Sequence, residues 1–303
     1  MRYGYQDKIL RIDLSTGTVA TEPLSDEMVD KFIGGRGFVA KLLFDELPRG
    51  IDAYDPENLF IAATGPLSGH FLPASGKTHF GAKSPATGGY ADSNMGGHFG
   101  PALKYAGYDV LVLTGKTADP SLLVIDDDHV EIRSAAAYWG QGALTAEKNL
   151  KDDLGEDFQI MTIGPAGENR VRHANIMFEP DHYAGRGGLG AVMGAKKLKA
   201  IRIGGDRNVV FKNEQTVKAI NQAGAKTFLG NFEKNPNGFL GVLRNYGTFG
   251  LLALNQKGGN LPVTNFNRAH LEDEEAVARF QHASIAETMV GKRTPCKLSL
   301  IHI

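Results

Sequence analysis

The chain has 303 residues, of which 42% are hydrophobic, and its formal net charge at pH 7 is −1. This length can bury the core of one large domain or of two, and the balanced charge argues against a nucleic-acid partner, which would require a basic excess. No run of residues reaches the roughly 18–20 apolar positions of a membrane span, and the polar N-terminus shows no signal peptide, so we expect a cytoplasmic protein without membrane contact.

Strand-like patterns dominate the first two thirds of the chain. Residues 9–14 and 18–21, joined by Ser15-Thr16-Gly17, predict a hairpin, and Ser25 predicts the cap of a helix that runs to residue 32. A second helix is expected over residues 38–47, before Pro48, and another over residues 144–154. Further strands are expected at residues 59–63, 78–83, 90–93, 108–114, 122–126, 130–133, 159–163, 172–178 and 200–203.

The pattern changes after Gly204-Gly205-Asp206. Residues 213–229, 239–255 and 273–281 all predict helices, with no strong strand between them. We therefore expect an α+β fold of two domains, a strand-rich domain over residues 1–208 and the beginning of a helical domain over residues 209–303.

Three glycine-rich loops follow predicted strands, whereas the usual catalytic motifs are missing. The chain contains no His-Glu-x-x-His, no Gly-x-Ser-x-Gly and no P-loop motif. Glycine-rich loops expose consecutive backbone N–H groups, which can bind phosphate or another anion. The loops lie at residues 65–69, 92–100 and 164–169, the last followed by a glycine-rich stretch over residues 184–194.

Three side chains near these loops suit a phosphorylated ligand. Lys77 and Arg186 would supply positive charge, and an arginine can donate two parallel hydrogen bonds to phosphate oxygens. Asn94 offers a neutral carbonyl oxygen of the kind that Mg²⁺ accepts. Several such loops predict a large phosphorylated ligand, or two.

An alternative interpretation is a dinucleotide-binding or other non-catalytic phosphate-binding module. Gly185-x-Gly187-x-x-Gly190 matches the dinucleotide motif, and Asp206 lies close to the required spacing of about 20 residues. That motif should directly follow a strand, whereas residues 179–183 intervene here and the helix after it is short. The Rossmann interpretation is therefore the less favoured one.

The order of several segments resembles the aldehyde:ferredoxin oxidoreductase family of tungsten or molybdenum bis-pterin enzymes. Each segment alone is modest evidence, but their joint order from about residue 5 to Cys296 is specific. The matching segments are Ile12-Asp13-Leu14-Ser15-Thr16-Gly17, Ile33-Gly34-Gly35-Arg36-Gly37, Gly65-Pro66-Leu67-Ser68-Gly69, Lys83-Ser84-Pro85, Met95-Gly96-Gly97, Leu103-Lys104-Tyr105-Ala106-Gly107-Tyr108-Asp109, Ile163-Gly164-Pro165-Ala166-Gly167-Glu168-Asn169 and residues 184–199.

The resemblance implies a first domain of two β-sheets that forms a base for two pterin-dithiolene groups, whose phosphates are bridged by Mg²⁺. It assigns the side chain of Asn94 and the backbone carbonyl of Tyr183 to the Mg²⁺. The residues that would line the pterin and its phosphate are Lys77, Asn94, Gly96, His182, Tyr183, Gly185 and Arg186. Lys77 stands where we expect an arginine, and it lacks the forked hydrogen-bonding geometry of that residue.

Cys296 is the single cysteine, so the chain has no internal disulfide framework. The resemblance makes it the first of the thiolates that hold a [4Fe–4S] cluster, but Ser299 and Ile303 occupy the positions of the next two. We expect a chain that is cut at this motif, with a non-native tail over residues 298–303, and the alternative is a relative without the cluster. The resemblance implies that the intact enzyme oxidises an aldehyde to a carboxylate and passes the electrons to ferredoxin or another iron–sulfur carrier. It also allows a homodimer. We nominate no residue of this chain as a catalytic acid or base.

Overall fold

The computed structural model describes residues 2–70, 72, 75–180 and 182–289. The chain separates into two compact units, Met1–Lys212 and Asn213–Ile303. All the named strands of the described residues lie in unit 1, and the named elements of unit 2 are helices. The α+β class is confirmed, with two mixed sheets and helices.

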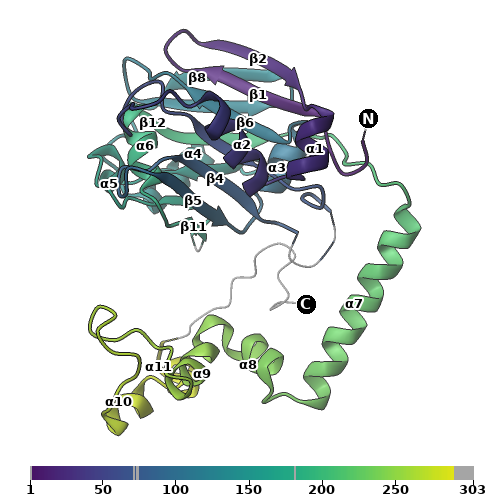
Figure 1. The fold of residues 1–303 in the computed structure, drawn as a ribbon, viewed down its shortest axis with the longest axis vertical. Helices are drawn as coiled ribbons and strands as arrows, with labels where there is room; N and C mark the ends of the chain where they lie inside the picture. The colour runs from purple at the N-terminus through teal and green to yellow at the C-terminus, as the bar shows by residue number, and fades with distance from the viewer. Residues whose placement is uncertain (1, 71, 73–74, 181, 290–303) are drawn as a thin grey trace. The chain divides into compact units, whose positions relative to one another are not determined.

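The first sheet of unit 1, sheet A, has six strands in the order β2-β1-β6-β3-β4-β5 (Figure 1). β1 and β6 are parallel, and the other neighbouring pairs are antiparallel. The strands are β1 (Lys8–Asp13), β2 (Thr18–Pro23), β3 (Phe60–Ala63), β4 (Thr78–Lys83), β5 (Tyr90–Met95) and β6 (Val110–Thr114). β2 and β5 are therefore the two edges of sheet A.

The second sheet, sheet B, also has six strands, in the order β11-β10-β9-β12-β7-β8. Its parallel pair is β12 with β7. The strands are β7 (Ser121–Asp126), β8 (His129–Ser134), β9 (Gln159–Thr162), β10 (Ile176–Phe178), β11 (His182–Ala184) and β12 (Leu198–Gly204). β11 and β8 are its edges.

The largest hydrophobic cluster contains residues from both sheets, and the alternation of side chains along β3 shows how sheet A contributes to it. Phe60 and Ala62 belong to this inner cluster, and Ile61 and Ala63 belong to a second cluster that includes residues of α1 (Asp26–Phe32) and α2 (Arg36–Glu46). Such alternation is expected because successive side chains of a strand point to opposite faces.

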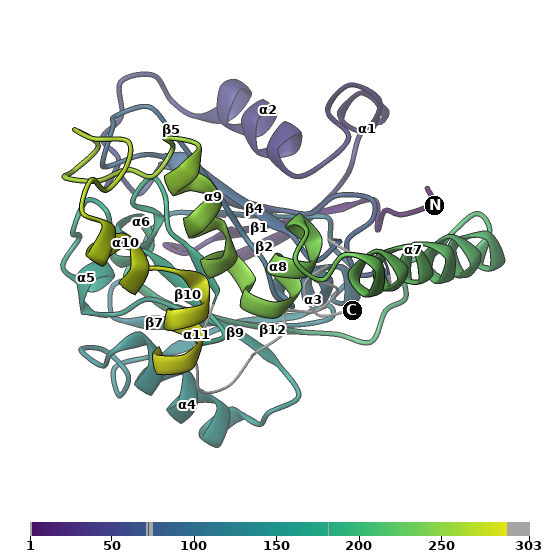
Figure 2. The ribbon, with the colours of Figure 1, turned by 90° about the horizontal axis from the view of Figure 1, so that it is seen from below.

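Helices pack on both sides of the two sheets and between them. α1 and α2 lie on one side of the strands and α4 (Ala143–Leu154) on the other (Figure 2). α4 buries Ala146 and Leu150, as its apolar spacing predicts. The inner cluster also includes residues of α3 (Phe99–Tyr105) and α6 (Leu189–Ala195), while α5 (Pro165–Glu168) is a single turn.

Unit 2 begins with the long helix α7 (Glu214–Lys234), capped by the side chain of Asn213. The helix expected over residues 239–255 is split by the 3₁₀ turn Gly247–Gly250 into α8 (Phe239–Tyr246) and α9 (Leu251–Lys257). α10 (Glu274–Arg279) and α11 (His282–Met289) follow. Among the described residues, no helix is long and apolar enough to cross a membrane.

A strand directly precedes Gly185, so the expectation that residues 179–183 separate this motif from a strand is wrong. β11 covers His182–Ala184, and α6 and β12 follow it. Three successive antiparallel pairings separate β11 from β12, so the two strands are antiparallel. A dinucleotide-binding unit requires parallel strands on either side of its helix, so the topology excludes that fold here.

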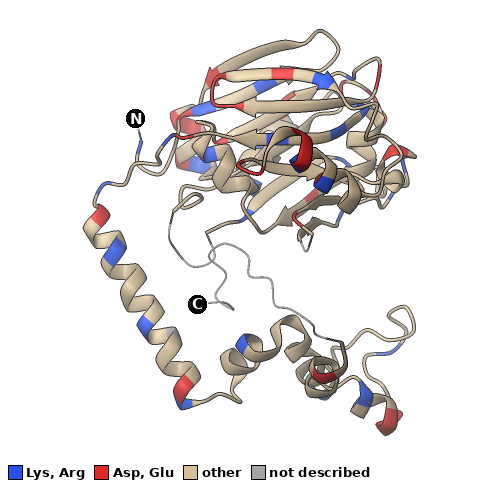
Figure 3. Ribbon diagram, turned by 180° about the vertical axis from the view of Figure 1, so that it is seen from behind, with Lys and Arg blue, Asp and Glu red and all other residues tan. Residues whose placement is uncertain are grey.

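Charged residues of both signs are interspersed over the strands of unit 1 (Figure 3). Several form exposed or half-exposed ion pairs, such as the pair between Arg11 and Glu46 at 2.7 Å. The absence of a nucleic-acid partner stays a prediction from the net charge.

Candidate cofactor-binding edge

The edge strands β5 of sheet A and β11 of sheet B lie side by side in unit 1 (Figure 1). The backbone N–H of Arg186, just after β11, donates to Oγ of Ser93 in β5 at 3.2 Å. Gly187 has a φ of +72°, and a Cβ atom there would lie 2.6 Å from Cβ of Ala91. The loop after β11 can therefore approach β5 only because residue 187 is glycine. We call this region, with the loops that flank both strands, the joined edge.

The register of β4 and β5 sets which residues share a face. His79 pairs with Asn94, and Thr78 pairs with Met95, which places Lys77 and Gly96 at the next position of the same ladder. Ser93 and Met95 are buried, whereas Asn94 is exposed on the opposite face. The predicted Mg²⁺ ligand Asn94 thus lies at the surface of the joined edge.

Three of the predicted cofactor-binding residues meet at Gly96. A Cβ atom on Gly96 would lie 3.0 Å from Cδ2 and 3.3 Å from Nε2 of His182, and 3.8 Å from Nζ of Lys77. Residues 77, 96 and 182 come from β4, β5 and β11 or their ends, so the fold brings together segments that are distant in the sequence. An ammonium group and an imidazole beside a glycine without a side chain form a donor set that fits a phosphate.

The other predicted residues lie along the same edge. Tyr183 is 46% exposed, and its hydroxyl donates to the carbonyl of Pro180 at 3.0 Å. Gly185 and Arg186 are exposed in the loop after β11. A shared Mg²⁺ site between Asn94 and the carbonyl of Tyr183 stays a prediction, and Cys296 lies outside the described residues.

A carboxylate that the sequence did not point to, Glu179, is hydrogen-bonded to one histidine at this edge and lies near a second. Oε1 of Glu179 lies 2.6 Å from Nδ1 of His98, and its Oε2 lies 3.6 Å from Nδ1 of His182. His98 and Glu179 are 81 positions apart, so no local motif could have paired them.

A second polar cluster, also missed, lies on the Asn94 face of β4 and β5. The carboxylate of Asp92 pairs with Nε2 of His79 at 2.5 Å and with a guanidinium nitrogen of Arg36 at 2.9 Å. Burial lowers the pKa of His79, against the opposing charge of Asp92. Burial, with Asp92 nearby, raises the pKa of Tyr90 to about 12, so this phenol stays protonated at neutral pH.

The third glycine-rich loop has a packing role. A Cβ atom on Gly167 in α5 would lie 2.8 Å from the carbonyl oxygen of Gly190, and one on Gly194 would collide with the carbonyl of Gly167. These glycines let α5 and α6 touch. The close contact of the two helices accounts for these glycines, and anion binding by this loop stays a prediction.

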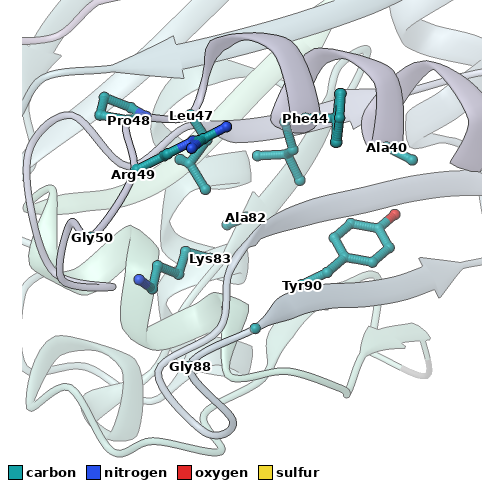
Figure 4. Close-up of a pocket in the computed structure, with 12 residues that line it drawn as sticks. Ala40, Phe44, Leu47, Pro48, Arg49, Gly50, Ala82, Lys83, Gly88 and Tyr90 are labelled. Atoms are coloured by element: carbon teal, nitrogen blue, oxygen red, sulfur yellow. The ribbon is translucent and has the colours of Figure 1, made fainter.

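A groove of about 540 Å³ lies in unit 1 between α2, with the residues that follow it, and the hairpin of β4 and β5 (Figure 4). Phe44 of α2 and Leu47 just after it face Tyr90 and Lys83 of the hairpin, with Arg49 at one end. None of the residues predicted to bind the cofactor is among those that line it. Its volume alone does not make it the functional site.

Comparison with known proteins identifies the family. Residues 9–205 match the model of the family described as "Aldehyde ferredoxin oxidoreductase, N-terminal domain". The chain belongs to the aldehyde ferredoxin oxidoreductase family. The resemblance inferred from the order of the segments is thereby confirmed.

Relatives in this family are tungsten enzymes. The chain is 41% identical over 292 residues to the tungsten-containing aldehyde ferredoxin oxidoreductase of Pyrococcus abyssi and 39% identical to that of Pyrococcus horikoshii, covering 96% of the chain in each case. It is also 40% identical over 215 residues to the "Aliphatic sulfonate oxidoreductase, WOR-like subunit" of Pyrococcus furiosus, covering 66% of the chain and 34% of that protein. The chain spans about half, 46%, of the length of the two aldehyde ferredoxin oxidoreductases.

A solved structure has the same fold over 99% of this chain, with a TM-score of 0.85 and 28% sequence identity. It is the active-site complex BamBC of benzoyl coenzyme A reductase in complex with 1,5-dienoyl-CoA, and 46% of that chain is covered. The names of these proteins differ in the substrate that they state, and the residues that match the family's N-terminal domain, 9–205, lie in unit 1.

Proposed function

We propose that unit 1 is the base on which a tungsten or molybdenum bis-pterin is held, in an enzyme that oxidises aldehydes to carboxylic acids. The observation that carries this proposal is the meeting of Lys77, Gly96 and His182 at the joined edge. Each of these residues was predicted from the sequence, and the fold brings together side chains from both sheets. The names of the relatives support the tungsten cofactor and the aldehyde substrate.

The chain's own residues would act by binding and orientation. Lys77 and Arg186 would neutralise phosphate charge, and Gly96 would allow the phosphate to approach the backbone closely. Asn94 and the carbonyl of Tyr183 would supply oxygen ligands to Mg²⁺, which prefers such donors. When bound, the metal–pterin group supplies the redox chemistry, in which an aldehyde and water yield a carboxylate, three protons and two electrons.

The remaining parts of the proposal concern the whole enzyme. Cys296 would contribute to a [4Fe–4S] cluster together with cysteines that this sequence does not contain, since such clusters use four thiolates. Ferredoxin or a related iron–sulfur carrier would take the electrons. A cytoplasmic location, expected from the N-terminal sequence, and a homodimer of the intact enzyme complete the proposal.

The test is the exchange Asn94→Ala in full-length enzyme that carries this chain, with Asn208→Ala as the control at another exposed asparagine. We expect Asn94→Ala to lower bound tungsten and pterin well before it lowers solubility, because Mg²⁺ requires near-ideal octahedral coordination. Elemental analysis measures the bound tungsten, and fluorescence measures the bound pterin. Wild-type protein that contains no pterin would instead support a non-catalytic phosphate-binding module.

A further inference from the structure

The carboxylate of Glu179 lies between two imidazole rings at the joined edge. Its two oxygens lie 2.6 Å from Nδ1 of His98 and 3.6 Å from Nδ1 of His182. The side chains of Glu179, His98 and His182 are 21%, 32% and 14% exposed, so the group is largely withdrawn from water. Hydrogen bonds between charged or polar side chains hold geometry best in such partly buried places.

The backbone holds Glu179 in an uncommon conformation. Its φ is +52°, a left-handed value that non-glycine residues rarely adopt and that persists only where the surroundings impose it. A Cβ atom on Gly97 would lie 2.7 Å from Oε2 of Glu179 and 2.6 Å from the ring of Phe178. Gly97 therefore leaves the space that the Glu179 carboxylate occupies.

The carboxylate of Glu179 lies on the Nδ1 side of the His182 ring, at ion-pair distance but beyond hydrogen-bonding distance. Nδ1 of His182 faces Glu179, whereas Cδ2 and Nε2 face Gly96, with Nζ of Lys77 next to the same point. The negative charge of Glu179 attracts the Nδ1 side of the ring and so favours the orientation in which Nε2 points the other way. If Glu179 were absent, the ring could rotate and withdraw Nε2 from the place where Lys77 is.

We infer that Glu179 and His98 are positioning residues for phosphate binding at the joined edge. Glu179 orients His182 toward Gly96 and Lys77, and His98 holds the second oxygen of Glu179. Neither residue would touch the phosphate. The inference rests on the proposed function, because it assumes that a phosphate group binds beside Lys77 and His182.

The test measures the binding of inorganic phosphate to the 303-residue chain by isothermal titration calorimetry. We expect Glu179→Gln to weaken phosphate binding roughly tenfold, the scale on which residues that orient a ligand-binding side chain act. Glu131→Gln is the matched control, because Oε1 of Glu131 lies 3.3 Å from Nε2 of His129 on the opposite edge of sheet B. This control should bind phosphate as the wild type does.

A double-mutant cycle separates positioning from a general structural effect. In a His182→Gln background, Glu179→Gln should cause no further loss, because the residue through which it acts is already missing. Equal losses in both backgrounds would overturn the inference, and so would unchanged binding in Glu179→Gln alone. His98→Gln, which leaves Glu179 in place, should also lower phosphate affinity, but by a smaller factor. This variant replaces Glu179→Gln in the test if Glu179→Gln fails to fold.

The two proposals can fail separately. Wild-type chain that binds no phosphate would argue against the proposed function itself. Wild-type chain that binds phosphate, with Glu179→Gln binding equally well, would leave the proposed function intact and remove only the role of Glu179. Pterin content of full-length enzyme with Glu179→Gln gives a second readout, which should fall in parallel with phosphate affinity.

Discussion

Units 1 and 2 are built in different ways, although both contain well-formed helices. Unit 1 has three hydrophobic clusters and buries even lysines, such as Lys104, Lys196 and Lys199. In the described part of unit 2, the buried residues are Phe232, Gly241, Gly250 and Ile285. The described helices of unit 2 therefore bury few side chains, whereas those of unit 1 are stabilised by tertiary packing. The comparison shows that regular secondary structure is no measure of how firmly a region is held.

The largest expected effect on stability concerns a buried ion pair in unit 1. The side chains of Lys104 and Asp109 pair at 0% exposure, and Lys104 also donates to the carbonyl of Gly4 at 2.9 Å. Lys104→Met should reduce the free energy of unfolding by about 3–5 kcal/mol, because it leaves the Asp109 carboxylate buried without its partner. Urea unfolding followed by the single tryptophan, Trp139, measures unit 1.

Two controls test whether the buried pair is responsible. Lys148→Met removes an exposed lysine from α4 and should change the unfolding free energy little. Adding Asp109→Leu to Lys104→Met should recover part of the loss, because no unpaired charge then remains. A double variant as unstable as Lys104→Met would show that the pair itself contributes little.

The next largest effect is a decrease in the unfolding free energy of unit 1 at acidic pH. Burial and the nearby charge of Lys104 lower the pKa of His70 to about 4, against an ordinary value of 6.5. The unfolded chain therefore takes up a proton at higher pH than the folded one, and the free energy of unfolding should fall as pH drops from 6.5 toward 4. The loss is up to about 3 kcal/mol.

The exchange His70→Phe should remove this part of the acid dependence. His79, whose pKa is also lowered by burial, would retain its own contribution. His173→Phe, at an exposed histidine, is the control and should leave the pH profile of unfolding as in the wild type. An unchanged profile in His70→Phe would mean that another group is responsible.

The two units should also differ in protease sensitivity. Lys148 in α4 and Lys218 in α7 are both exposed lysines within helices, one in each unit. Cleavage requires local unfolding, whose free energy is lowest where few apolar contacts hold a segment. Trypsin should therefore cut after Lys218 roughly 100-fold faster than after Lys148, a ratio that mass spectrometry of timed digests can measure. Cleavage of α4 first would contradict the comparison.

The smallest effect concerns the cap of α7. The side chain of Asn213 accepts a hydrogen bond from the backbone N–H of Thr216 at 2.9 Å. Asn213→Ala should cost about 1 kcal/mol of local helix stability, visible as faster amide exchange in the first turns of α7. Gln222→Ala, in the interior of the same helix, should not speed exchange there. Unit 1 should show no change in either variant.

Much of the secondary structure could be predicted from the sequence because its signals are local. β4 covers the expected residues 78–83, and Ser25 caps α1 by accepting from the backbone N–H of Met28. β11 was missed because three residues, His182–Ala184, carry no alternating pattern. The helix expected over residues 239–255 is interrupted because Gly247 has a φ of +61°, which ends α8.

Only part of the candidate site could be predicted from the sequence, because some of its contacts join residues that are distant in the chain. The residues that resemblance supplied, such as Lys77, Gly96 and His182, lie together in the fold. The two residues proposed to orient His182, Glu179 and His98, have no motif of their own and are brought together only by the tertiary structure. A lone histidine in a sequence indicates little, because the partner that gives it a role is distant in the chain.

The parallel pairing of β1 with β6 bears on how the protein is made. Ile9 pairs with Val110, so strand β1 is synthesised long before its inner neighbour exists. At about 5–20 residues per second, translation of the intervening segment takes roughly 5–20 seconds. During that time the β1–β2 hairpin has no other strand beside it, and an isolated hairpin is marginally stable in water. Sheet A can therefore be completed only after β6 has left the ribosome, and Leu10 and Ile12 of β1 stay exposed until then.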